Sequence, residues 1–210
     1  MVGSTLYYIH DPMCAWCWGF VPVWQAIQKS LPNNVNTRYV LGGLAPDSDQ
    51  VMPLAMQQYI QSNWKRIQQV VPTTQFNDDF WTQCQPRRST YPACRSVLAA
   101  KEQGAQYEQQ MIQGIQQAYY LNAENPSDNE VLVLVAGRIG LNTERFIQHL
   151  NSAEVQQQLD NDIQLYHQLS EKTGVSGFPS LVLKVGSNYQ ALPIDYHNPR
   201  ITLNVIGECS

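Results

Sequence analysis

The hydrophobic positions near the start of the chain follow the spacing of a strand and then that of a helix. Residues 5–10 (TLYYIH) are rich in aromatic and branched side chains, which is typical of a strand. The apolar residues that follow recur at steps of four, three and four, which predicts an amphipathic helix: Phe20, Trp24, Ile27 and Leu31. Residues 35–41 (VNTRYVL) predict a second strand, which Gly42-Gly43 ends. This order predicts a β-α-β unit, whose strands normally run parallel.

The middle of the chain has a helical pattern without strand-like alternation. Helical periodicity covers residues 51–71, and further helix starts are predicted at 91–93, 126–128 and 142–144. The helix that starts at 91 has a proline in its first turn, where proline is tolerated, and its apolar run extends toward Tyr120. Residues 46–150 are therefore predicted to be a helical insertion.

Strand patterns return at the end of the chain. A helical apolar stripe runs through residues 155–169, and a turn over 174–179 (GVSGFP) follows it. Residues 180–185 and 189–192 predict two strands joined by a hairpin turn. The tail, residues 199–206 (PRITLNVI), also reads as a strand, which at a sheet edge could pair with another copy.

Length and charge limit the classes of function. A chain of 210 residues fits one large domain, or a small domain that carries an insertion. Its 13 basic and 17 acidic residues disfavour nucleic acid as a partner, because such binding needs many phosphate-neutralising cations. The apolar stretches at 6–9 and 131–136 are too short for a signal peptide or for the ~20 residues of a membrane span. We expect a cytoplasmic protein with no membrane partner.

The cysteines give the first indication of chemistry. An odd number of cysteines without a leader peptide argues against a disulfide framework and for a reducing compartment. They are Cys14, Cys17, Cys84, Cys94 and Cys209. In a reducing compartment, the close pair is more readily explained by catalysis or metal binding than by a structural disulfide.

The spacing Cys14-Ala15-Trp16-Cys17 between a strand and a helix favours redox chemistry. The thiolate is the nucleophile of disulfide exchange, and the N-terminus of a helix favours an anion. Cys14 is the predicted nucleophile, and Cys17, one turn later, is the predicted resolving thiol. The alternative is half of a zinc site, which needs about four ligands. No second ligand pair is evident in the sequence, so no metal is predicted.

Residues 9–20 (IHDPMCAWCWGF) resemble the opening of the DsbA-like, FrnE-type predicted protein disulfide isomerases. Three further features fit this family: Pro22, the YPACR motif at 91–95 and the GVSGFP turn at 174–179. The resemblance extends from about residue 5 to residue 192. It implies an α/β, thioredoxin-like fold formed by residues 1–45 and 151–210, with residues 46–150 as the inserted helical domain. Thioredoxin folds generally end with a helix, so the strand expected for the tail departs from the family pattern.

The resemblance also implies roles for the residues of the GVSGFP turn. Pro179 would be in cis and face the cysteine pair, although an ordinary trans proline is the alternative. The backbone beside it, at Ser176 and Gly177, would pair with an extended substrate peptide. Phe178 would modulate the reactivity of the cysteines.

Three more features allow two interpretations each. Trp16 could contact a peptide or a small aromatic ligand, or it could pack the start of the helix. His10 could donate to the Cys14 thiolate or shift its pKa, or it could be structural. Cys84 and Cys94 could form a second redox pair if their Cα atoms lie within ~7 Å, since some FrnE-type proteins carry an auxiliary disulfide. We favour two unrelated thiols there.

The leading hypothesis is a thiol–disulfide oxidoreductase that acts on protein or low-molecular-weight thiols. No tightly bound cofactor is expected, and glutathione is a candidate redox partner. The alternative is a glutathione-dependent isomerase or transferase, because 2-hydroxychromene-2-carboxylate isomerases and kappa-class transferases share the fold. Those enzymes usually have serine at the position of Cys14, so both cysteines favour redox chemistry. A non-catalytic zinc-binding or partner-binding module is the third possibility.

Overall fold

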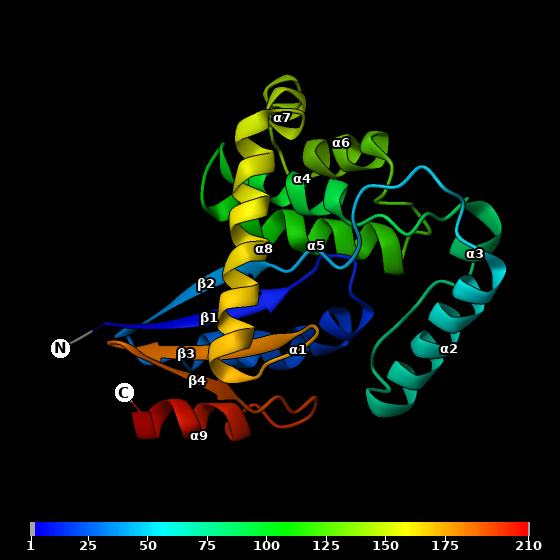
Figure 1. Ribbon diagram of the computed structural model, residues 1–210. Coiled ribbons are helices and arrows are strands. Elements are labelled where there is room, and N and C mark those ends of the chain that lie inside the picture. Colours follow the sequence, from blue (N-terminus) through cyan, green and yellow to red (C-terminus); the bar gives the residue numbers. More distant parts are fainter. Residues whose placement is uncertain (1–2, 210) are drawn as a thin grey trace. The chain divides into compact units, whose positions relative to one another are not determined.

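The computed structural model describes residues 3–209, with side chains up to residue 208, and the chain divides into two compact units (Figure 1). Of the described residues, 3–42 and 162–209 form the first unit, and 43–161 form the second. The chain returns from the second unit to the first between residues 161 and 162. This boundary lies inside the long helix α8 (Ala153–Thr173), which continues across it without a break. The domain limits expected from the sequence, at 45 and 150, remain predictions.

The first unit is built on a mixed sheet, which contains both parallel and antiparallel strand pairs. Its elements are β1 (Ser4–His10), α1 (Ala15–Lys29), β2 (Val35–Leu41), β3 (Ser180–Val185), β4 (Asn188–Leu192) and α9 (Arg200–Cys209). Within residues 3–209 the sheet has four strands in the order β2-β1-β3-β4. β1 and β2 are parallel, as the β-α-β pattern predicts, whereas β3 is antiparallel to β1 and to β4.

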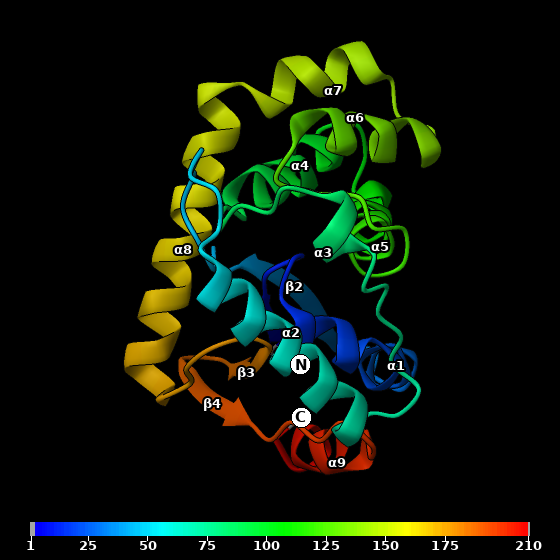
Figure 2. The same cartoon turned by 90° about the vertical axis from the view of Figure 1, so that its right-hand side faces the viewer.

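Both faces of this sheet are covered by helices. Because side chains alternate along a strand, Leu6 and Tyr8 of β1 face one way, and Tyr7 and Ile9 face the other. The first pair packs on α1 and α9, which lie beside each other (Figure 2). The second pair packs on the C-terminal part of α8 through its buried Leu169. The end of β1 is thereby fixed from both sides.

The strand expected for the tail is wrong, because residues 200–209 form helix α9. The fully buried Thr202 and Ile206 lie four positions apart and so share one face of this helix. The Thr202 hydroxyl donates to the carbonyl of Pro193 at 2.7 Å, which ties the helix to the end of β4. The branched residues of the tail suit a strand in isolation, but burial of one helical stripe outweighs that propensity.

The second unit is helical, as predicted, apart from an isolated bridge between Val51 and Arg87. Besides the first part of α8, its helices are α2 (Leu54–Val70), α3 (Phe80–Gln83), α4 (Tyr91–Lys101), α5 (Gln106–Tyr120), α6 (Asn129–Arg138) and α7 (Thr143–Leu150). The run predicted from residue 91 toward Tyr120 is two helices, because Gly104 has a φ of 150° between them. Glycine adopts such a backbone without the steric cost that other residues meet.

An aromatic cluster joins three helices of this unit. Trp64 of α2 is 1% exposed and stacks on Phe76 with ring centroids 4.8 Å apart. Phe80 of α3 and Tyr119 of α5 meet edge to face at 4.7 Å, and Tyr119 lies 5.6 Å from Trp64. Such pairs add directional attraction to the burial of large apolar surfaces.

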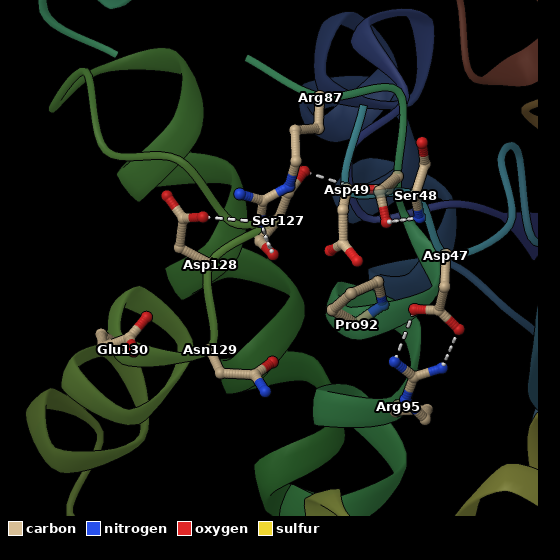
Figure 3. Close-up of a pocket in the computed structure, with 11 residues that line it drawn as sticks. Asp47, Ser48, Asp49, Arg87, Pro92, Arg95, Ser127, Asp128, Asn129 and Glu130 are labelled. Carbon is tan, nitrogen blue, oxygen red and sulfur yellow. Dashed lines mark hydrogen bonds and ion pairs between the residues drawn. The ribbon is translucent and has the colours of Figure 1, made fainter. Parts of the chain in front are cut away.

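The second unit also holds a polar cavity of about 340 Å³ (Figure 3). Arg95 pairs with Asp47 through two contacts of 2.8 and 2.7 Å, and Arg87 pairs with Asp128 at 2.6 Å. These ion pairs link the segment before α2 to α4, and the segment before α4 to the start of α6. The guanidinium groups at this cavity are thus engaged by carboxylates of the same unit.

None of the helices within residues 3–209 combines the length and the apolar character needed to cross a membrane.

Candidate thiol site

The cysteine pair lies where β1 leads into α1. Cys14 is the N-cap residue of α1, with φ −79° and ψ 117°, and its N–H donates to the carbonyl of Asp11 at 3.0 Å. Cys17 lies inside the first turn of the same helix. Cys14 is 7% exposed and Cys17 is 0% exposed, so Cys14 is the thiol nearer to solvent.

Cys17 is held in its protonated form by its surroundings. Burial raises its pKa well above the ordinary value, and a hydrogen bond with the Cys14 side chain raises it further. A hydrogen bond from the Asp11 backbone acts in the opposite direction, whereas the charge of Asp11 raises this pKa. The two thiols therefore contact each other, and the deeper thiol keeps its proton at neutral pH.

Asp11 is a residue of this site that the sequence analysis did not identify. It is fully buried, and its carboxylate Oδ1 accepts the N–H of Met13 at 2.8 Å. This side-chain contact to a backbone two residues on is the hydrogen bond of an Asx turn, which the sequence Asp-Pro indicates. The sequence pattern does not show that this carboxylate lies near Cys17, because that proximity arises only in the folded chain.

The GVSGFP turn precedes β3 and emerges at the same end of the sheet as the cysteine turn, because Ile9 pairs with Ser180. The peptide bond between Phe178 and Pro179 is cis, and the Phe178 carbonyl accepts a hydrogen bond from Cys14 Sγ at 3.5 Å. Gly177 has a φ of 75° and donates its N–H to the Tyr166 hydroxyl at 3.2 Å. Ser176 and Gly177 are exposed on this turn, while Phe178 and Pro179 are half-buried.

Trp16, between the two cysteines, is half-buried against a second aromatic residue that was not predicted. Its ring meets that of Tyr196 at 5.2 Å, and Tyr196 also meets Phe20 at 5.6 Å. Burial raises the pKa of Tyr196, and the nearby Cys17 and Cys14 raise it further. Tyr196 follows β4, in a segment to which the sequence pattern assigned no role.

His10 lies in the core and not at the surface around Cys14. It is 0% exposed, stacks on Tyr8 at 5.1 Å and meets Tyr39 edge to face at 5.6 Å. Among the described residues, neither ring nitrogen has a hydrogen-bond partner. Burial lowers the pKa of His10 to about 3, so the ring is neutral at physiological pH.

Cys84, Cys94 and Cys209 lie far from the Cys14–Cys17 pair in the sequence. Cys84 and Cys94 are both reduced thiols of the second unit. Cys84 Sγ donates to the carbonyl of Ala123 at 3.0 Å, whereas Cys94 is fully buried in α4. The side chain of Cys209 lies outside the described residues. In the part of the chain that the structure describes, no three His, Cys, Asp or Glu side chains form a group that could hold a metal ion.

A sequence model of the thioredoxin family matches residues 7–192. The chain belongs to the thioredoxin family. Two curated relatives are named ClpXP adapter protein SpxH: one from Halalkalibacterium halodurans, 25% identical over 167 residues, and one from Bacillus subtilis, 24% identical over 161 residues. The matches cover 76% of this chain in both cases, and 53% and 52% of the relatives. The chain thus spans about half the length of these proteins.

Solved structures confirm the α/β thioredoxin-like fold. A Nitrosomonas europaea protein, provisionally named a protein disulfide isomerase, has a TM-score of 0.83 and 24% identity over 98% of this chain and 97% of its own. The cytosolic disulfide reductase DsbM from Pseudomonas aeruginosa has a TM-score of 0.78 and 22% identity over 98% of this chain and 100% of its own. Other neighbours, an oxidoreductase DsbA from Xylella fastidiosa and DsbA from Pseudomonas aeruginosa, share this fold.

We predict that His10 makes the free energy of unfolding depend on pH. Its ordinary pKa is 6.5, which applies to the unfolded chain, whereas the folded chain holds it at about 3. Between these pKa values only the unfolded state binds a proton at this histidine. As the pH falls through this range, the free energy of unfolding therefore decreases by about 1.4 kcal/mol per pH unit. His10→Phe should remove this dependence in urea unfolding between pH 7 and pH 5.

The matched control is His167→Phe, since His167 is exposed on α8 of the same unit. This variant should keep the pH dependence of the wild type. A difference in unfolding free energy between wild type and His10→Phe that stays constant over this pH range would contradict the prediction.

Proposed function

We propose that this protein is a thiol–disulfide oxidoreductase whose working pair is Cys14 and Cys17. The observation that carries the proposal is the contact between the two thiols, with Cys14 as the N-cap residue of α1 and Cys17 buried beneath it. The N-terminus of a helix favours an anion in general, because the N–H groups of its first turn have no partner within the helix. The family and the neighbours named as disulfide reductases support the same chemistry.

In the proposed reaction, the Cys14 thiolate attacks one sulfur of a substrate disulfide. The substrate S–S bond breaks, a mixed disulfide forms on Cys14, and the first substrate thiolate leaves and takes up a proton. The Cys17 thiolate then attacks Cys14 Sγ, which forms the Cys14–Cys17 disulfide and releases the second substrate thiol. The substrate gains two electrons and two protons, and the cysteine pair loses them. A thiol reductant must return the pair to its starting state.

The second step requires Cys17 to lose its proton inside the protein. Asp11 supplies the nearby buried carboxylate whose charge acts on Cys17. We assign it the role of proton acceptor for this step, since a positioned base makes proton transfer compatible with neutral pH. Its fixed orientation, through the Met13 N–H, supports this role.

The residues around the pair take different parts in the proposal. The exposed backbone at Ser176 and Gly177, beside the cis bond to Pro179, is where an extended peptide would lie. Phe178 places its carbonyl on Cys14, and Trp16 offers an apolar contact to the substrate. His10 has no direct contact with substrate in this proposal and supports the end of β1 from within the core.

The proposed partners are protein disulfides or low-molecular-weight thiols in the cytoplasm. One structure of the DsbM neighbour contains glutathione, which supports glutathione as a reductant here. No tightly bound cofactor is part of the proposed reaction. A glutathione-dependent isomerase or transferase is less well supported, because such chemistry has no use for the second thiol at Cys17.

Replacing the cysteines one at a time tests the proposal. Cys14→Ser should reduce the rate of insulin disulfide reduction at least 100-fold, since no other thiol replaces the nucleophile. Cys17→Ser should reduce it at least 10-fold and leave a mixed disulfide on Cys14, visible by intact-protein mass spectrometry. Cys84→Ser, a control in the second unit, should stay within about twofold of wild type.

Wild-type rates in both Cys14→Ser and Cys17→Ser would rule out disulfide exchange by this pair. Turnover of a small electrophile with glutathione, unimpaired in Cys17→Ser, would instead support the isomerase or transferase alternative.

A second prediction concerns Asp11. Asp11→Asn keeps an oxygen that can accept the Met13 N–H but removes the proton acceptor. The release of the second substrate thiol should slow roughly 10-fold at pH 7 in a single-turnover quench, with a smaller deficit at pH 9, where Cys17 ionises more readily. If Asp11 acted only through its charge, the substitution would lower the pKa of Cys17 and accelerate this step, which would contradict the assigned role.

A further inference from the structure

Gly42 lies against the aromatic ring that precedes the cis-proline. It follows β2, is buried, and donates its N–H to the carbonyl of His10 at 2.8 Å. A Cβ atom at this position would lie 1.9 Å from Cε1 and 2.1 Å from Cζ of Phe178. Any side chain larger than hydrogen at position 42 therefore requires the Phe178 ring to move.

Position 42 requires glycine because a side chain there would overlap the Phe178 ring, and not because of its backbone conformation. The adjacent Gly43 has a φ of 62°, in the left-handed region that favours glycine, whereas the φ of Gly42 lies outside that region. In the sequence, both glycines mark the end of the second strand. The structure separates them: Gly43 has the left-handed backbone, and Gly42 lies against an aromatic ring.

The Phe178 ring has little freedom to move away. It meets the ring of Tyr166 at 5.1 Å and packs on the core between the sheet and α8. The Gly177 carbonyl accepts the Ser180 hydroxyl at 2.9 Å, which links the turn to the start of β3. A displaced ring would therefore carry the Phe178 backbone with it, including the carbonyl that contacts Cys14 Sγ.

We propose that Gly42 is a positioning residue of the thiol site, whose missing side chain seats the Phe178 ring and so holds the Phe178 carbonyl on the Cys14 sulfur. This inference rests on the proposed function and deepens it, because it adds a residue that acts on Cys14 through Phe178. Gly42 touches neither thiol nor substrate in this account.

The contact has a defined consequence for the redox equilibrium. The Cys14 thiol donates to the Phe178 carbonyl in the reduced protein, but a Cys14–Cys17 disulfide has no S–H to donate. The contact thus stabilises the reduced form relative to the disulfide. Loosening it should shift the equilibrium with glutathione toward the disulfide.

The test compares Gly42→Ala with Gly207→Ala. Gly207 is an exposed glycine of α9 in the same unit, and a Cβ atom there would meet no atom within 4 Å. Gly42→Ala should raise the equilibrium constant for disulfide formation with oxidised glutathione about 2–5-fold, the range for a modest hydrogen bond. It should also accelerate alkylation of reduced Cys14 by a similar factor. Gly207→Ala should leave both quantities within experimental error of wild type.

Phe178→Ala provides the rescue, because it removes every ring atom that the new Cβ would meet. In that background, adding Gly42→Ala should change neither quantity, so the two substitutions should be strongly non-additive. If Gly42→Ala alone fails to fold by circular dichroism, the double variant should fold. Wild-type values in Gly42→Ala, an undiminished effect without the ring, or a double variant that stays unfolded would each overturn the inference.

Failure of the proposed function gives a different result. If the wild type forms no Cys14–Cys17 disulfide at any glutathione ratio, the oxidoreductase proposal is wrong. The positioning role of Gly42 is then decided by the alkylation rate alone, which requires no turnover. Equal Cys14 alkylation rates in Gly42→Ala and Gly207→Ala would overturn it.

Discussion

The pairing of β1 with β3 is the constraint on which the site depends. It sets Ile9 opposite Ser180, so the turn after β1 and the turn before β3 emerge at the same end of the sheet. Cys14 and Phe178 are 164 positions apart in sequence, yet this register brings the thiol and the carbonyl into contact. The helices on both faces bury β1 and keep this register, because a slip by one residue would turn its apolar side chains to the wrong face.

Burial keeps the groups around the pair uncharged. It raises the pKa of Cys17 and of Tyr196, lowers that of His10 to about 3, and also raises the pKa of Tyr8. In each case the neutral form is favoured because the charged form loses its hydration. An anion formed on the reacting sulfur thus has neutral neighbours, apart from Asp11. Asp11, whose charge acts on Cys17, is then the proton acceptor that we propose.

Local patterns in the sequence predicted the β-α-β opening, the hairpin and the cysteine pair, because strand composition, helical periodicity and CxxC spacing are all short-range signals. The helix α9 was missed because the branched residues of 199–206 favour a strand by local propensity, and burial of Ile206 on one helical face outweighs it. Asp11, Tyr196 and Gly42 were also missed. Asp11 lies near Cys17, Tyr196 contacts Trp16, and Gly42 lies against Phe178. These contacts form only in the folded chain, so no spacing rule could predict them.

The most direct test of the central claim is a redox titration of the Cys14–Cys17 couple against glutathione, with acid quenching and mass spectrometry. The proposed function predicts a single two-electron transition, seen as a loss of two mass units and absent in Cys14→Ser. The midpoint would also report whether the pair favours reduction or oxidation of its partners, since 30 mV corresponds to about 1.4 kcal/mol for this couple. A chain whose two thiols stay reduced at every glutathione ratio would contradict the account.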